Sequence, residues 1–219
     1  SLGARFKGKH VGTFGGGGTF SFFFSHHIST MEGGAIITNC EKHANDLRSM
    51  RAHGWIRDRS DRDQIKHLNA DANIDDRWLF VLPGFNLRPT EIQGAIGQVQ
   101  LSRIDGYIKD RKGIANHVAS VFSDINDLKV IGHELSGEAF DCSWMNIPIE
   151  IRPEASANKQ QIVQIFEDAG FETRPIIAGN FCLHPVGELL NSKGLHRLHI
   201  GGYTQNMDQE YCFCLGGEF

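Results

Sequence analysis

Short apolar runs separated by glycine-rich turns mark the first part of the chain. Residues 19–24 form an aromatic-rich run that predicts a buried strand, and residues 33–39 predict a second strand. The four glycines at 15–18 lack the Gly-Lys-Ser/Thr and the following helix that a phosphate-binding P-loop needs. They are therefore more typical of a flexible turn between short strands.

Helical spacing follows this strand-rich part. Residues 40–51 predict a helix with Ala44, Leu47 and Met50 on its apolar face. The charged stretch 54–83 has no clear periodicity, so we expect a loop there. A loop of that length inside a compact domain is usually functional.

A longer helix is predicted after Pro89. Thr90 can cap this helix, and Gln93 can complete the capping box from the third position. Apolar residues recur at approximately helical spacing, at Ile92, Ile96, Val99, Ile104 and Ile108. The amphipathic stretch 114–122 continues or follows this helix.

The last third of the chain changes to short strands around one helix. Strands are predicted at 128–131, 144–151 and 171–174. A helix is predicted over 158–169, with Gly170 as its C-terminal stop. The resulting β-β-α-β order is typical of a small α+β domain.

Composition and charge narrow the possible functions. The chain has 219 residues, of which 40% are hydrophobic, enough for one large domain or two modest ones. A net charge of −4 with both signs mixed lacks the basic patch of a nucleic-acid-binding protein. No apolar run approaches the roughly 18 residues of a membrane span, and no signal peptide is evident. We expect a cytoplasmic protein that binds neither nucleic acid nor membrane.

Cysteine and histidine patterns give little support to a metal site. The five cysteines are scattered, which suits a reducing compartment better than a disulfide framework. Cys212 and Cys214 form a CxC that has no partner pair at zinc-site spacing. His26 and His27 would point to opposite faces of an extended segment, which is poor geometry for chelation. We expect no metal.

The most informative segment surrounds His26. It consists of Ser21-Phe22, three residues, His26, five residues and Glu32-Gly33-Gly34. This pattern resembles the sugar aminotransferases of the DegT/DnrJ/EryC1/StrS family, which carry their Schiff-base lysine at the position of His26. Three further segments resemble the family in the same order, at residues 47–54, 84–97 and 171–175. The resemblance spans most of residues 1–185 and fades afterwards.

The resemblance implies an α/β fold-type-I transferase dependent on pyridoxal 5'-phosphate (PLP), like aspartate aminotransferase. Residues 1–112 would form the C-terminal part of the PLP-binding large domain, and residues 113–219 the small α+β domain. We therefore expect the chain to be approximately the C-terminal half of a family protein and inactive in isolation. Because the family's active sites lie at a subunit interface, a homodimer with shared sites is expected.

Four site residues carry over from the resemblance. Ser21 would donate its hydroxyl to the cofactor phosphate, and Asn86 would donate its amide to the phosphate of the neighbouring subunit. His26 would be the catalytic base, and His53 would pair with the sugar or with His26. Structural alternatives are a strand-edge serine, a left-handed turn asparagine, a satisfied core histidine and a helix-end histidine, respectively.

Histidine in place of lysine changes the expected chemistry. The primary amine of lysine bonds covalently to PLP, whereas imidazole cannot do so and titrates near neutrality. Within the family this exchange marks sugar 3-dehydratases rather than aminotransferases. The resemblance then implies L-glutamate as the amine donor that converts PLP to pyridoxamine 5'-phosphate (PMP). The product would lack the C3 hydroxyl of a nucleotide-linked 4-keto-6-deoxy sugar, in dideoxysugar and surface-polysaccharide biosynthesis.

Two dehydratase subtypes carry a double histidine. The subtype for CDP-4-keto-6-deoxyglucose also binds an iron–sulfur cluster through several cysteines. Residues 54–80 contain no cysteine, which favours the subtype for GDP-4-keto-6-deoxy-D-mannose. A non-catalytic protein without cofactor is the third interpretation.

Overall fold

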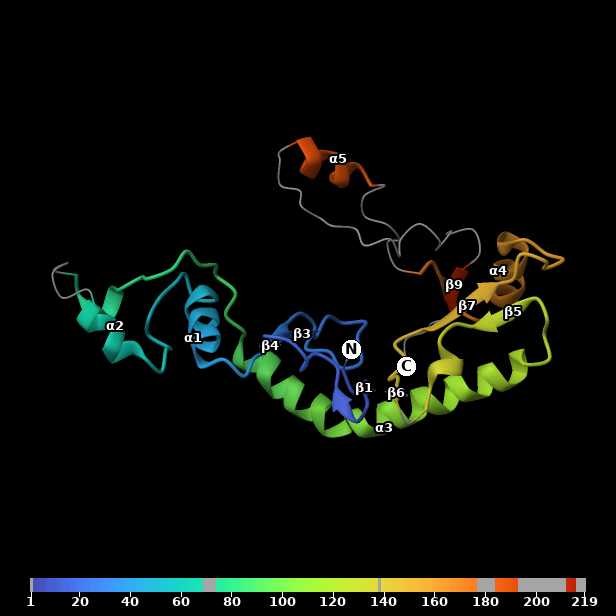
Figure 1. Ribbon diagram of the computed structural model, residues 1–219, viewed down its shortest axis with the longest axis horizontal. Helices are drawn as coiled ribbons and strands as arrows, with labels where there is room; N and C mark the ends of the chain where they lie inside the picture. The colour runs from blue at the N-terminus through green and yellow to red at the C-terminus, as the bar shows by residue number, and fades with distance from the viewer. Residues whose placement is uncertain (1, 69–73, 138, 177–183, 193–211, 216–219) are drawn as a thin grey trace. The chain divides into compact units, whose positions relative to one another are not determined.

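The computed structural model describes residues 2–68, 74–137, 139–176, 184–192 and 212–215. These residues divide between two units. The first unit comprises Ser1–Ile108 with Glu138–Asp141, and the second comprises Lys109–Gly137 with Cys142–Phe219. The long helix α3 (Glu91–Phe122) contributes residues to both units (Figure 1). The domain boundary expected at residue 112 stays a prediction.

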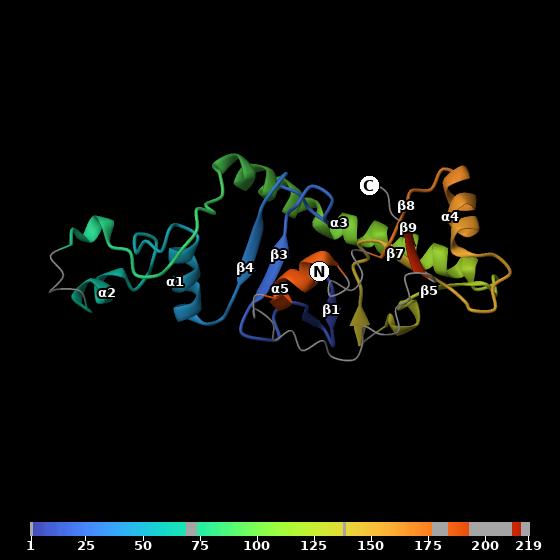
Figure 2. The ribbon, with the colours of Figure 1, turned by 90° about the horizontal axis from the view of Figure 1, so that it is seen from above.

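Short antiparallel strands form two small sheets in the first unit. β1 (Arg5–Phe6) pairs with β2 (Lys9–His10) on one side and with β6 (Phe140–Asp141) on the other. β3 (Gly18–Ser21) pairs with β4 (Gly34–Ile37), and Figure 2 shows these two strands side by side. Gly15 and Gly16 lie in a bend between β2 and β3, which confirms the predicted turn for this part of the run, whereas Gly18 begins β3.

The strand predicted over residues 19–24 is shorter and more exposed than expected. It ends at Ser21, and residues 22–24 belong to the loop that follows. The Phe24 side chain is exposed. Over so few residues, periodicity does not separate a buried strand from an aromatic loop, so the sequence overestimates the length and burial of β3.

α1 (Glu41–Met50) confirms the predicted helix but not its buried face. Ala44, Leu47 and Met50 are only partly buried. The fully buried residues of α1 are instead Asn45 and Ser49. The reason is that the polar loop after α1 packs against this face, so its buried positions are those that can form hydrogen bonds.

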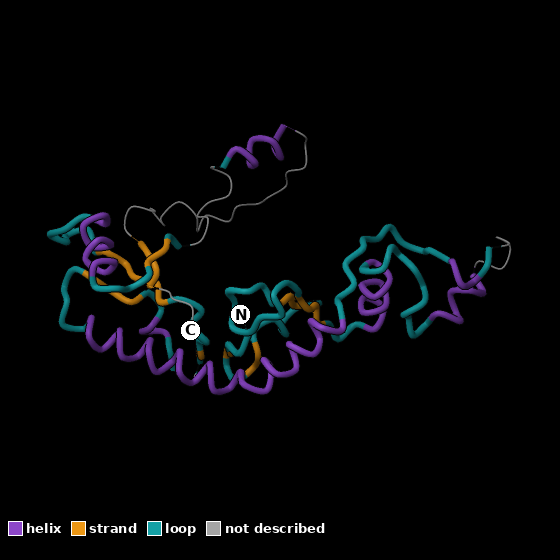
Figure 3. The backbone as a smooth tube through the Cα atoms, turned by 180° about the vertical axis from the view of Figure 1, so that it is seen from behind, coloured by secondary structure: helices purple, strands orange, loops and turns teal. Residues whose placement is uncertain are grey.

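The charged stretch 54–83 is not a plain loop. It contains α2 (Arg62–Leu68) and a short 3-10 turn (Asp76–Trp78). Asp63 in the first turn of α2 and Lys66 in its last turn match the helix dipole. Because these residues give no apolar period, the pattern could not reveal the helix. Figure 3 shows a loop between α1 and α2.

α3 is a continuous helix of 32 residues, so the two predicted amphipathic stretches join. Its capping box is confirmed: the Thr90 N–H donates to Gln93 Oε1 at 2.8 Å, and the Gln93 N–H donates to Thr90 Oγ1 at 3.4 Å. In the predicted apolar stripe, Ile92 and Val99 are exposed, and the other three residues are partly buried. Among the helices described, α3 included, none is sufficiently long and apolar to cross a membrane.

A four-stranded antiparallel sheet organises the second unit. Its strand order is β5-β7-β9-β8. The strands are β5 (Leu128–Val130), β7 (Ile147–Ile151), β8 (Thr173–Arg174) and β9 (Cys212–Leu215). The predicted strands at 128–131, 144–151 and 171–174 are confirmed with shorter bounds, whereas β9 was not predicted. The remaining helices are α4 (Lys159–Asp168) and α5 (Pro185–Ser192).

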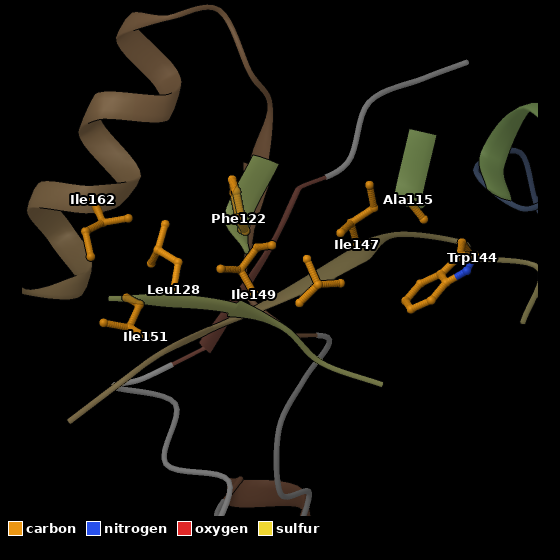
Figure 4. Packing of buried hydrophobic residues seen from close by; sticks show 9 residues of the cluster. Ala115, Phe122, Leu128, Trp144, Ile147, Ile149, Ile151 and Ile162 are labelled. Carbon is orange, nitrogen blue, oxygen red and sulfur yellow. The ribbon is translucent and has the colours of Figure 1, made fainter. Parts of the chain in front are cut away.

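Apolar side chains of β5, β7, α3 and α4 form the core of the second unit. Along β7, Ile147, Ile149 and Ile151 are buried, while the two residues between them are partly exposed. Figure 4 shows Ile162 of α4 next to Leu128 and Ile151. α4 itself begins and ends as predicted, with a capping box at Asn158 and a left-handed Gly170 after its last turn.

Candidate active site

The loop between β3 and β4 carries the candidate base His26. The Phe22 N–H donates to the Gly33 carbonyl at 2.9 Å, and the Phe22 carbonyl accepts from the Thr30 N–H at 3.0 Å. Gly33 has a φ of +146°, and a Cβ there would lie 2.6 Å from Thr30 Oγ1. The closed base of the loop therefore requires glycine at this position.

The His26 ring is half-buried and is held by packing. Its centroid lies 5.9 Å from that of Phe23, with an edge-on angle of 77° between the rings. Its Nδ1 is enclosed, and the described residues offer it no hydrogen-bond partner. Buried polar atoms in native sites normally have a partner, so this nitrogen is suited to a ligand. The neighbouring His27 is more deeply buried than His26, with 6% of its surface exposed.

Ser21 lies at the edge of the same loop. It is the last residue of β3 and pairs with Gly34 across the hairpin. Its exposed Oγ accepts a long hydrogen bond, 3.3 Å, from the Phe23 N–H. A serine hydroxyl can donate one hydrogen bond while it accepts others, so the proton of Ser21 is available to an anion.

His53 and Asn86 lie on neighbouring segments. Ala52 and Asn86 form an antiparallel bridge, and the His53 N–H donates to the Phe85 carbonyl at 2.8 Å. Both candidate side chains are exposed. The left-handed conformation proposed as the structural alternative for Asn86 is found instead at His53, which has a φ of +63°. The structure thus brings together two of the four predicted site residues.

Two glycines allow these segments to approach. Gly54 has a φ of +86°, and a Cβ on it would collide with the Leu82 carbonyl. A Cβ on Gly84 would collide with the Gly54 nitrogen. Glycine at both positions therefore explains why the His53-Gly54 and Gly84-Phe85-Asn86 motifs occur together.

A buried arginine braces the segment that follows His53. The Arg59 side chain is 5% exposed and lies 2.9 Å from Asp46 of α1. Its Nε and Nη2 donate to both carboxylate oxygens of Asp61, at 2.8 and 2.9 Å. Hydrogen bonds from Arg59 lower the pKa of Asp61, and hydrogen bonds from Lys42 and Arg59 lower the pKa of Asp46. These bonds tie residues 59–61 to α1.

The four candidates fall into two groups. Ser21 and His26 share the loop after β3, and His53 and Asn86 share the bridge after α1. Among the described residues, no hydrogen bond or ring contact joins His26 to His53, so their predicted pairing stays a prediction. In that part of the chain, no three His, Cys, Asp or Glu side chains gather as a metal site would require.

Sequence reasoning missed one contact at this site. Gln93 Nε2 donates to the Glu32 carbonyl at 2.7 Å and so links the start of α3 to the loop of His26. The capping box signalled the role of the Gln93 oxygen, but nothing local signals a partner 61 residues away.

The model of one family matches residues 1–196, and that family is the DegT/DnrJ/EryC1/StrS aminotransferase family. The chain belongs to this family. A curated relative from Escherichia coli, GDP-4-keto-6-deoxy-D-mannose 3-dehydratase, is 40% identical over 181 residues, which cover 83% of this chain and 45% of that protein. The protein of the same description from Yersinia pseudotuberculosis is 38% identical over 225 residues, which cover 96% of this chain and 55% of that protein.

A solved family structure has the same fold. It is described as E. coli GDP-4-keto-6-deoxy-D-mannose-3-dehydratase with bound hydrated PLP. It matches with a TM-score of 0.80 and 33% identity, covering all of this chain and 54% of that chain. The predicted fold class, that of the PLP-dependent members of this family, is confirmed. The chain spans about half the length of the curated relatives that it matches.

Proposed function

We propose that this chain is part of a PLP/PMP-dependent 3-dehydratase that removes the C3 hydroxyl of GDP-4-keto-6-deoxy-D-mannose. Dideoxysugar and surface-polysaccharide biosynthesis would be its context, and the cytoplasm its location. The observation that carries the proposal is His26 in the family's lysine position, on a loop whose two ends keep the family pattern. Because the chain spans half of its relatives, the activity is proposed for the full-length protein.

The residues present fit PLP and PMP. His26 has an enclosed Nδ1 without a partner, which suits a polar ligand against the loop. Ser21 has an exposed hydroxyl that can donate to a phosphate oxygen. Histidine cannot bond covalently to PLP as lysine does, so this site would hold its cofactor through noncovalent contacts only.

His26 would move the protons of the reaction. When bound, the cofactor supplies an electron sink for the pair released as a C–H bond breaks. A neutral imidazole can accept the proton from that carbon, and the protonated ring can then donate it to the departing C3 hydroxyl. The edge-on contact with Phe23 limits the orientations that the ring can adopt.

Asn86 and His53 support a shared site in a homodimer. Asn86 is exposed, and its backbone is held by the bridge to Ala52. Its amide would donate to the cofactor phosphate of the neighbouring subunit. His53, exposed on the adjoining segment, would contact the sugar. L-glutamate would be the amine donor that converts PLP to PMP.

The direct test compares the wild-type full-length protein with His26→Lys. Each is incubated with PLP, L-glutamate and GDP-4-keto-6-deoxy-D-mannose, and the sugar product is identified by mass. We expect the wild type to lose one oxygen and release ammonia, and His26→Lys to lose this activity or to form an amino sugar. His10→Lys is the matched control, because it makes the same exchange at an exposed residue of β2.

Three results would contradict the proposal. An amino sugar from the wild type would show that His26 does not decide the chemistry. Unchanged dehydration by His26→Lys would show that the base lies elsewhere. Absence of any product, together with failure to bind PMP, would select the non-catalytic interpretation.

A further inference from the structure

One side chain fastens the loop of His26 to α3. The Glu32 carbonyl, near the end of this loop, accepts two hydrogen bonds. One comes from Thr30 Oγ1 within the loop, at 2.7 Å, and the other from Gln93 Nε2 on α3, also at 2.7 Å. The second bond connects residues 61 positions apart in the sequence.

The other end of the same amide is also used. Gln93 Oε1 accepts from the Thr90 N–H at 2.8 Å and from Thr90 Oγ1 at 3.2 Å. A carboxylate could make these bonds but could not donate to Glu32, and an aliphatic side chain could do neither. A glutamine amide performs both tasks at once: it caps α3 and holds the loop.

Close packing at Gly97 supports this contact. A Cβ on Gly97 would lie 3.2 Å from Thr30 Cγ2, so α3 passes directly against the loop. Gln93 and Gly97 are four residues apart and therefore share a face of the helix. Ile92 and Val99 of the same helix turns are 67% and 51% exposed. The described part of α3 thus meets the loop through a hydrogen bond and a glycine, with little apolar burial.

We propose that Gln93 is a positioning residue for the reaction of His26, an inference that rests on the proposed function. A general base must lie within hydrogen-bond reach of its proton, and His26 sits on the loop that Phe22, Thr30 and Gly33 close. Gln93 holds this closed loop at the helix that begins just after the Asn86 segment. Loss of the bond to Glu32 frees the loop and moves the imidazole away from its working position.

The test uses Gln93→Glu in the full-length protein. This variant keeps an oxygen for Thr90 but replaces the donor to Glu32 with a repelling carboxylate. Gln98→Glu, an exposed position of the same helix, is the matched control for charge. Thr90→Ala removes the capping hydroxyl and leaves the bond to Glu32, so it separates helix capping from loop positioning.

We expect Gln93→Glu to lower kcat about 10- to 100-fold, the effect of displacing a catalytic group by about 1 Å. The KM for the nucleotide sugar should change little, and both controls should keep kcat close to that of the wild type. An unchanged kcat in Gln93→Glu, or an equal loss in Thr90→Ala, would overturn the inference. If Gln93→Glu does not fold, Gln93→Asn replaces it, since the shorter amide cannot span both partners.

A second measurement needs no activity. Hydrogen exchange at the Phe22 and Thr30 amides reports whether the loop stays closed. We expect faster exchange in Gln93→Glu than in Gln98→Glu, and equal exchange would overturn the inference. If the wild type forms no dehydrated product, the proposed function fails, while this exchange comparison still decides whether Gln93 holds the loop.

Discussion

β7 in the second unit and α1 in the first unit bury different kinds of side chain. On β7, Ile147, Ile149 and Ile151 alternate with partly exposed residues and pack into an apolar core. On α1, the residues with the least exposure are Asn45 and Ser49, at 1% and 0%. One region is closed by apolar contact and the other by hydrogen bonds to a loop.

The buried polar side chains of α1 each have defined hydrogen-bond partners in residues 48–60, which we call the polar region together with α1. Asn45 Oδ1 accepts from the Ser60 N–H at 3.0 Å and from Arg48 at 3.0 Å, while Asn45 Nδ2 donates to Ser60 Oγ at 2.9 Å. Ser49 Oγ donates to the Trp55 carbonyl at 2.8 Å. Apolar cores tolerate substitutions that keep the buried volume, whereas each of these polar groups needs its own partner. The polar region is therefore suited to hold the loop after His53 in one conformation.

The largest expected effect is in the apolar core. Ile149→Ala should destabilise the second unit by about 2–5 kcal/mol, because it leaves a cavity at a fully buried position. The free energy of opening is measured by hydrogen exchange at the β7 amides of the full-length protein.

A control substitution on the neighbouring strand shows how much of this loss of stability comes from the cavity. Lys129→Ala on β5 removes an exposed ion pair with Glu134, 2.9 Å apart, and should cost less than about 1 kcal/mol. Equal effects of the two substitutions would mean that the apolar core does not dominate the stability of this unit.

Asn45→Leu tests the polar region with a side chain of similar size. A buried leucine on a helix is ordinarily favourable, but here it leaves the Ser60 N–H and the Arg48 guanidinium without their partner. We expect a cost of about 1–3 kcal/mol, measured by hydrogen exchange at the amides of residues 52–60. Stabilisation by Asn45→Leu would show that this region behaves like the apolar core.

The same contrast explains which elements could be predicted. The alternation on β7 and the caps of α4 are local signals, so both elements were predicted near their observed bounds, whereas β9 of the same sheet was not predicted. α1 was predicted as a helix but with the wrong face, because the partners of Asn45 and Ser49 lie in a stretch without periodicity. α2 was not predicted, because the groups that stabilise it are charges at its ends and give no apolar periodicity.

The candidate site could be predicted only where the sequence spacing of its motifs identifies it. The distance of His26 from Ser21-Phe22 and from Glu32-Gly33-Gly34 is a sequence property, and so is the order of the motifs around His53 and Asn86. The enclosure of His26 Nδ1 and the bond from Gln93 to Glu32 depend on tertiary packing. No local pattern encodes a contact that forms only when α3 reaches the loop.

The smallest expected effect is a loss of stability of the polar region at low pH. Hydrogen bonds from Arg59 lower the pKa of Asp61 below its ordinary value of 3.8. A carboxyl whose pKa is lowered on folding stabilises the folded state above that ordinary value, and this contribution is lost as the pH falls through the folded pKa. We expect the opening free energy of residues 52–61 to fall by less than about 1 kcal/mol over this range, since Asp61 is 27% exposed and partly screened.

Arg59→Met should flatten this acid dependence, whereas Arg62→Met, at a more exposed arginine, should preserve it. The same acid slope in both variants would mean that Arg59 does not set the protonation of Asp61, and that the polar region is held by its uncharged hydrogen bonds alone.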